Sequence, residues 1–271
     1  MRVLVTGAAG AIGRVVTPGL CDLGHEVVGL DLVPEPEGFT GDWHTVDCAD
    51  VDAVMAAFAA QPLDAVVHLA GIGEECSLPE ALTSHVITTA ALLDAMVAHQ
   101  VTRLVYASSN HAVGRTPRRE LASEPISIDA LPRPDTFYGV AKVAAEALMH
   151  LYADRYALDT ISCRIGSFLD EPMTARGLST WLSPADGVRM VAAALTAPAP
   201  GFAVLYGISA NTRAWWDLEP GRRLGYDPQD DAEDYADGIP HRDEDADEAA
   251  YVGGPYALEE LHRPALGDAP I

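Results

Sequence analysis

The chain has 271 residues and carries 40 acidic against 17 basic side chains, which gives a formal net charge of −23 at pH 7. Because such a surface repels other polyanions, we expect neither nucleic acid nor an anionic membrane as a partner. The length suits one α/β domain with an elaborated C-terminal part. No uncharged apolar run suggests a signal peptide or a membrane span, and the 4 cysteines are dispersed without a C-x-x-C pair. We therefore expect a cytoplasmic protein with reduced thiols.

The first expected element is a short buried strand over residues 3–5, followed by three glycines and a helix over 11–23. Gly7 permits a tight turn, Gly10 lets the backbone approach a phosphate, and Gly13 lets the helix pack closely on the strand. The helix would aim free N–H groups and its positive dipole end at a pyrophosphate. The spacing is one residue wider than G-x-G-x-x-G, so a turn without a ligand is the alternative.

A second expected strand, over residues 25–31, ends in Asp31, which lies 18 residues after Gly13. A carboxylate at this strand end would accept hydrogen bonds from both ribose hydroxyls of an adenosine and would repel a 2′-phosphate. Asp31 therefore favours NAD over NADP, although aspartate is also common in turns at strand ends.

Further strands and helices are expected to alternate along the chain. The expected strands cover 43–46, 65–71, 102–108, 159–165 and 202–208, and the expected helices cover 50–60, 79–100, 138–156 and 183–197. Such alternation predicts an α/β fold with a doubly wound, mostly parallel sheet, the Rossmann fold, and a small C-terminal substrate-binding portion. We expect a single domain in which residues 1–166 mainly bind the nucleotide and residues 167–271 mainly bind the substrate.

The helix over 138–156 carries the residues that indicate the chemistry. Its apolar positions from Val140 to Leu151 follow helical spacing and form one face. Tyr138 and Lys142, the only lysine in the chain, are four residues apart and so project from one side of its first turns. A free phenol titrates near about 10, but a lysine ammonium and a positive nicotinamide would both favour the phenolate. Ser109, at the end of the preceding strand, would hold the substrate oxygen; an exposed helix pair and a turn serine are the alternatives.

Together these residues make the chain resemble the extended short-chain dehydrogenase/reductase superfamily, also called the NAD-dependent epimerase/dehydratase superfamily. Within it, the chain most resembles the uronate dehydrogenase family. The longer strings that carry this resemblance are SSNHAVG at 108–114, RIGS at 164–167, LSTW at 178–181, SAN at 209–211 and WWD at 215–217. The resemblance implies NAD-dependent oxidation of C1 of glucuronate or galacturonate to an aldaro-lactone, without a metal.

The resemblance also implies which residues form the site. The catalytic set is Ser109, Tyr138 and Lys142. The cofactor positions are Gly7, Ala9, Gly10, Ala11, Ile12, Gly13, Asp31, Asp47, Leu69, Ala70, Gly71, Tyr138, Lys142 and Ile165. The substrate positions are Gly73, Ser109, Asn110, His111, Ser167 and Arg176. An arginine fork is suited to grip the carboxylate of a uronate, although a solvated loop arginine is the alternative for Arg176.

Two positions depart from the family pattern, and several alternatives stay open. His85 stands where the superfamily usually has asparagine, and Gly73 stands where uronate dehydrogenases tend to have a serine, so the sugar preference could be relaxed or changed. The alternative functions are a dehydrogenase of neutral aldoses, a nucleotide-sugar epimerase or dehydratase, and a dinucleotide sensor without activity. We expect a homo-oligomer in which the long apolar helices could pair, and the acidic composition fits either salt adaptation or a genome bias.

Overall fold

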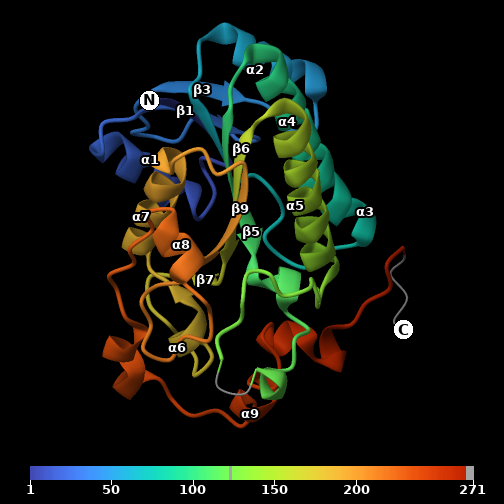
Figure 1. Cartoon of the computed structure of the whole chain (residues 1–271), viewed down its shortest axis with the longest axis vertical. Coiled ribbons are helices and arrows are strands. Elements are labelled where there is room, and N and C mark those ends of the chain that lie inside the picture. Colours follow the sequence, from blue (N-terminus) through green and yellow to red (C-terminus); the bar gives the residue numbers. More distant parts are fainter. Residues whose placement is uncertain (122–123, 267–271) are drawn as a thin grey trace.

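The computed structural model describes residues 1–121 and 124–266. Its centre is a seven-stranded sheet in the order β3-β2-β1-β4-β5-β6-β9 (Figure 1), and every neighbouring pair runs parallel. The strands are β1 (Arg2–Thr6), β2 (Glu26–Asp31), β3 (Asp42–Thr45), β4 (Ala65–His68), β5 (Arg103–Ser109), β6 (Asp159–Ile165) and β9 (Phe202–Gly207). The predicted parallel, doubly wound sheet is confirmed.

Helices cover both faces of the sheet (Figure 1). They are α1 (Gly13–Asp22), α2 (Val51–Ala60), α3 (Leu78–Ala81), α4 (Thr88–His99), α5 (Phe137–Tyr156), α6 (Gly177–Thr180), α7 (Pro184–Thr196), α8 (Glu219–Arg223) and α9 (Asp245–Glu248). Short 3-10 turns occupy Asn110–Val113, Arg118–Glu120, Ala232–Gly238, Gly254–Ala257 and Glu259–Leu261. Two short strands that the sequence did not reveal, β7 (Ser167–Phe168) and β8 (Trp181–Leu182), pair as a second parallel sheet.

The alternation of side chains along each strand builds two core layers. Val3 and Val5 of β1 pack with α1 and α7 on one face, whereas Leu4 between them packs with α2 and α4 on the other. The side chains of Val3, Leu4 and Val5 are all fully buried. Strands that are buried on both faces carry continuous apolar runs, which is why the strands could be located from the sequence.

The helix expected over 79–100 consists of three parts: α3, a π-helix over Leu82–Ile87, and α4. By length and composition alone, Leu78–His99 could cross a membrane, but 50% of its most apolar window is buried inside the fold. We therefore regard it as a core helix. The π-helical segment places His85 in the interior of the protein, where 1% of its surface is exposed. Such segments occur often at functional sites.

Helix α5 packs on the sheet through a different face from its apolar stripe. Val140 and Leu151 of the stripe are 37% and 39% exposed. The side that meets the sheet carries Ala141, Ala145 and Met149, which are fully buried. Small residues on this side leave room between helix and sheet for two long polar side chains, Lys142 and Glu146, which lie on the same face.

The strand order reverses between β1 and β4, because the chain adds β2 and β3 on one side of β1 and then returns to add β4 on the other. In sheets of this kind, ligands bind beyond the carboxyl ends of the strands at this point. The loops after β1 and β4 meet there: a Cβ atom on Gly7 would lie 2.6 Å from the backbone nitrogen of Ala70.

Candidate active site

The glycine loop after β1 adopts a backbone that only small residues permit. Gly7 has a φ of +68°, and its N–H donates to the carbonyl oxygen of Leu30 at 2.8 Å. A Cβ atom on Gly13 would lie 2.2 Å from the carbonyl oxygen of Gly7, so α1 can start against the loop only because residue 13 lacks a side chain. The turn and the close helix packing that the sequence predicts are both present, and they leave the phosphate side of the loop open.

A cavity of about 770 Å³ extends from this loop along the carboxyl ends of β1, β2, β3 and β4. It is lined by Gly7, Ala9, Gly10, Arg14, Asp31, Leu32, Val33, Val46, Asp47, Cys48, Ala49, Leu69, Ala70, Gly71, Ile72, Pro79, Glu80, Thr83, Ser84 and Thr88. Eight of the cofactor positions predicted from the sequence are among these residues. The glycine cradle and the carboxylate of Asp31 at the rim fit the pyrophosphate and the ribose of NAD.

Other cofactor positions predicted from the sequence lie outside this lining, and several lining residues were not predicted. Ala11, Ile12, Gly13, Tyr138, Lys142 and Ile165 do not line the cavity. Ser84 and Thr88, which do, come from the π-helix and the start of α4. Their position depends on how this helical segment crosses the strand ends, and no short motif encodes that crossing.

The serine, tyrosine and lysine of the predicted catalytic set meet where β5 ends beside α5. Ser109 is the last residue of β5, and Tyr138 lies in the first turn of α5. The Ser109 hydroxyl lies close enough to the Tyr138 phenol to lower its pKa. The ammonium of Lys142 donates to the carbonyl oxygen of Ala107 at 2.6 Å and lies over the rings of Tyr106 and Tyr138, at 4.7 and 5.2 Å from the ring centroids.

Burial dominates the acidity of both groups. Burial raises the pKa of Tyr138 to about 12, against a smaller lowering by the hydrogen bond from Ser109. Burial also lowers the pKa of Lys142 to about 7, although Glu146 opposes this change. In the protein without a bound cofactor, the loss of hydration therefore raises the pKa of Tyr138. That Lys142 and a positive nicotinamide together favour the phenolate stays a prediction for the protein with its cofactor bound.

His111 faces Tyr138 from the turn after β5. Its Nδ1–H donates to both carboxylate oxygens of Asp135, at 2.9 Å each, and the Asp135 side chain is fully buried. The imidazole ring lies edge-on to the rings of Tyr138 and Tyr256, with centroids 6.0 and 4.8 Å away. Because Asp135 holds Nδ1, Nε2 is the ring nitrogen left for a ligand.

Arg176 points into the protein and is held by the C-terminal segment. Its Nη2 donates to the carbonyl oxygen of Val252 at 2.9 Å, whereas its Nε is buried without a hydrogen-bond partner. Burial lowers the pKa of Arg176 to about 10, and the charges of Asp135 and Glu248 oppose that effect. The half-buried position of Arg176, packed against Val252 and Gly254, disfavours the solvated loop arginine that the sequence left as an alternative.

The remaining predicted substrate positions have simpler surroundings. Ser167 shares a hydrogen bond of 3.0 Å with the hydroxyl of Thr180. Asn110 is buried, and its side-chain oxygen accepts from the hydroxyl of Ser109 at 3.3 Å. Gly73 is exposed, and nothing lies within 4 Å of where its Cβ would be. A serine at this position would therefore fit without strain.

His85, the other departure from the family pattern, lies against Tyr138. Its Nε2–H donates to the carbonyl oxygen of Ile72 at 2.9 Å, and its ring lies edge-on to Tyr138 with centroids 5.2 Å apart. Burial and the nearby Lys142 lower the pKa of His85 to about 3. The imidazole thus stays neutral and ties the loop after β4 to the π-helix.

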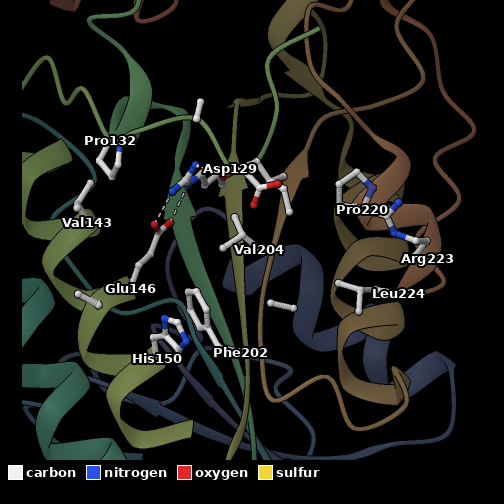
Figure 2. Close-up of a pocket in the computed structure, with 15 residues that line it drawn as sticks. Asp129, Pro132, Val143, Glu146, His150, Phe202, Val204, Pro220, Arg223 and Leu224 are labelled. Carbon is white, nitrogen blue, oxygen red and sulfur yellow. Dashed lines mark hydrogen bonds and ion pairs between the residues drawn. The ribbon is translucent and has the colours of Figure 1, made fainter. Parts of the chain in front are cut away.

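A second cavity, of about 500 Å³, opens between α5, β9 and α8 (Figure 2). At its inner end Arg164 donates from Nε and Nη2 to the two carboxylate oxygens of Glu146, at 3.1 and 2.8 Å (Figure 2). Glu146 also accepts hydrogen bonds from Ser108 and Ser162. Among the described residues that line this cavity, none belongs to the site predicted from the sequence.

The parallel sheet, the glycine cradle with Asp31, and the adjoining serine, tyrosine and lysine define an NAD-dependent dehydrogenase of the Rossmann type. Residues 3–169 match the NAD dependent epimerase/dehydratase family, and the chain belongs to this family.

Three relatives place the chain more closely. It is 35% identical to a uronate dehydrogenase of Pseudomonas syringae pv. tomato, over 94% of this chain and 92% of that protein. A crystal structure of a mutant uronate dehydrogenase from Agrobacterium tumefaciens complexed with NAD is 35% identical, covers 97% of this chain and 99% of that one, and has a TM-score of 0.88. The crystal structure of glucuronic acid dehydrogenase from Chromohalobacter salexigens is 35% identical, with 94% and 96% of the two chains covered and a TM-score of 0.86.

Proposed function

We propose that this protein oxidises C1 of an aldohexuronate, glucuronate or galacturonate, to the aldaro-lactone with NAD. The observation that carries the proposal is the inward-pointing Arg176, whose Nε has no hydrogen-bond partner. Arg176 is coupled to the reacting groups through Asp135. The carboxylate of Asp135 acts electrostatically on Arg176 and accepts a hydrogen bond from His111, and the His111 ring lies against the ring of Tyr138. A fixed cation at this place suits a substrate that carries a carboxylate.

The glycine loop would hold the pyrophosphate of NAD and Asp31 its adenosine ribose, and the bound cofactor would accept the hydride from C1. Ser109 would hold the C1 oxygen by a hydrogen bond, and the phenolate of Tyr138 would remove the hydroxyl proton from this oxygen. Lys142, fixed by Ala107, would stabilise the phenolate by its charge. The products are therefore the lactone, the reduced cofactor and one proton, which Tyr138 releases.

The substrate contacts would come from both parts of the chain. Arg176 would bind the carboxylate, and Nε2 of His111 would meet a hydroxyl group. Asn110, Ser109, Ser167 and the backbone at Gly73 would complete the sugar site. In this arrangement, residues 1–166 mainly bind the nucleotide, with Gly73, Ser109, Asn110 and His111 facing the sugar. Residues 167–271 mainly bind the substrate, through Ser167 and Arg176.

The test is to measure NADH formation with glucuronate, galacturonate, arabinose, glucose and a UDP-sugar, at low and at high salt. We expect the two uronates to give the highest kcat/KM. A higher value with arabinose or glucose would establish a dehydrogenase of neutral aldoses. An epimerase or dehydratase returns the hydride to the sugar and forms no net NADH, so conversion of the UDP-sugar is followed by chromatography; its turnover alone would establish nucleotide-sugar chemistry. Activity that requires high salt would identify the acidic composition as salt adaptation.

The proposal includes a homo-oligomer in the cytoplasm that binds neither nucleic acid nor membranes. The exposed apolar stripe on α5, from Val140 to Leu151, supports association between copies, and the net charge of −23 opposes binding to polyanions. Light scattering on the purified protein, combined with a charged substitution at Leu151, tests the association. A monomeric wild-type protein would contradict it.

A further inference from the structure

The first turn of α5 leaves no backbone N–H group without an acceptor, and an acidic side chain from a distant loop supplies two of the acceptors. The N–H groups of Phe137 and Tyr138 donate to Oε1 and Oε2 of Glu75, at 3.0 Å each. The N–H of Gly139 donates to the hydroxyl of Thr136 at 2.9 Å, and that of Val140 to the Thr136 carbonyl at 3.0 Å. Glu75 thus grips the backbone of the catalytic tyrosine itself.

Glu75 belongs to the loop between β4 and α3, which also borders the two ligand sites. Gly71 and Ile72 of this loop line the cofactor cavity, and Gly73 occupies a predicted substrate position. The carboxylate therefore joins this loop to the start of α5. Without it, a lengthwise shift of α5 would move the phenol of Tyr138 relative to both ligands.

The C-terminal segment meets the same loop. Nη1 of Arg263 donates to the backbone carbonyl of Glu75 at 3.3 Å, and the N–H of Leu78 donates to the carbonyl of Ala265 at 3.2 Å. Three segments that are far apart in the sequence are thus fastened together at Glu75. If Glu75 only capped α5, the hydrogen bonds from Arg263 to Glu75 and from Leu78 to Ala265 would not be needed.

We propose that Glu75 is a positioning residue that fixes Tyr138 at the distance from C1 that proton transfer requires. The proposal rests on the proposed role of Tyr138. The chemistry calls for a carboxylate, because two N–H donors face two oxygens and both acceptors carry negative charge at the positive end of a helix. Glutamine has only one acceptor oxygen, so its amide group would turn a donor toward one of the two N–H groups.

The matched pair of variants is Glu75→Gln and Glu74→Gln. Both remove one negative charge from the same loop, and Glu74 is exposed. In Glu75→Gln, we expect kcat to fall about 10- to 100-fold, because a small misplacement of a reacting group is costly. The KM for NAD should stay within about twofold, and Glu74→Gln should behave as wild type. Glu75→Asp, which restores both oxygens on a shorter stem, should recover part of the lost kcat.

Hydrogen exchange of the NAD-bound protein supplies a readout that does not depend on turnover. Peptides that contain Phe137 and Tyr138 should exchange faster in Glu75→Gln than in wild type, while peptides from the middle of α5 stay protected. A wild-type kcat in Glu75→Gln would overturn the proposal. So would a fall in kcat accompanied by an equal loss of protection along the whole of α5, since this would indicate general unfolding.

Failure of the proposed function would look different. If wild type oxidised no uronate but turned over another sugar of the panel, the Glu75 variants would be assayed with that sugar. If wild type oxidised no sugar at all, the catalytic part of the proposal would be wrong together with the proposed function. Unchanged exchange at Phe137 and Tyr138 in Glu75→Gln would then also show that Glu75 does not hold the start of α5.

Discussion

The carboxylate of Asp31 accepts a hydrogen bond from the backbone N–H of Ala9, with 2.9 Å between Oδ2 and the nitrogen. Its other oxygen accepts from the N–H of Val33 at 3.3 Å. The two bonds hold a negative charge at the rim of the cofactor cavity, beside the glycine loop. Because a 2′-phosphate would meet this charge, we expect a strong preference for NAD over NADP.

The Asp31→Asn variant tests this preference. It keeps the shape of the side chain but removes the charge, so kcat/KM should rise for NADP and fall for NAD, with the ratio changing by about tenfold or more. Initial rates with each cofactor at saturating sugar measure the ratio. Wild-type protein that preferred NADP would contradict the role of Asp31.

Replacement of Tyr138 by phenylalanine removes the proposed base and keeps the ring that packs against His85 and His111. We expect kcat to fall by about a thousandfold or more, with NAD affinity within a few-fold of wild type. Fluorescence titration with NADH measures the affinity. Turnover close to wild type would rule out Tyr138 as the base.

The pH profile of wild type tests the same residue. Burial raises the pKa of Tyr138 to about 12, so the phenolate fraction of the cofactor-free protein increases with pH throughout the neutral and alkaline range. The ammonium of Lys142, whose pKa burial lowers to about 7, loses its charge over part of the same range, so the rate of oxidation should depend on pH through both groups. A rate that did not change with pH on either side of neutrality, in a protein shown to stay folded, would contradict this assignment.

Arg176→Ala should raise the KM for uronates far more than that for neutral sugars, by about 10- to 100-fold, because one charge-assisted contact is lost. Arg222→Ala is a suitable control, since Arg222 is an exposed arginine paired with Glu219 at 2.6 Å. Melting temperatures of both variants would separate substrate binding from stability. Equal effects of Arg176→Ala on the two sugar classes would refute contact with the carboxylate.

His85 makes stability depend on pH in the acid range. Its pKa is about 3 in the folded protein, against 6.5 for a free histidine, so the unfolded chain binds more protons between these two pH values. Stability should therefore fall as the pH drops below about 6.5, by up to about 1.4 kcal/mol per pH unit from this residue.

Urea unfolding of wild type and His85→Asn at several pH values measures the effect of His85. The difference between the two proteins cancels groups that His85 does not influence, and it leaves His85 together with its electrostatic effect on the buried His68. The variant should lose less stability on acidification than wild type. Parallel curves for the two proteins would show that His85 is not held neutral by the fold.

The Glu146–Arg164 pair should matter more for stability than pairs on the surface. Both side chains are almost fully buried, at 6% and 5% exposure. Glu146→Gln would leave the Arg164 charge without its counter-ion and should cost about 3–5 kcal/mol of unfolding free energy. The matched change Glu219→Gln, in an exposed pair, should cost less than about 1 kcal/mol. Equal costs would mean that Glu146 and Arg164 are effectively hydrated.

The local sequence could predict much of this fold, because the features involved depend on neighbouring residues. The apolar run before Gly7 predicted a strand that is buried on both faces, and the glycine spacing predicted the loop. The four-residue spacing of Tyr138 and Lys142 predicted that both lie on one side of a helix. The outcome agrees in each case, since strand and helix periodicity act over a few residues.

Other features depended on which segments pack together. Helix α5 turns its small residues toward the sheet and leaves Val140 half-exposed, because the space inside is taken by Lys142 and Glu146. The π-helix that carries His85 has no local signal that we detected. The raised pKa of Tyr138 in the cofactor-free protein also follows from burial by surrounding segments, which the local sequence does not reveal.

The sequence by itself therefore determined the parallel sheet and the nucleotide loop, and it singled out the groups that we propose react. Only the tertiary structure decided their environment: Asp135 behind His111, the C-terminal segment around Arg176, and Glu75 at the start of α5. The physical reason is that periodicity and turn preferences are local, whereas desolvation and hydrogen bonds between distant segments exist only after the chain has packed.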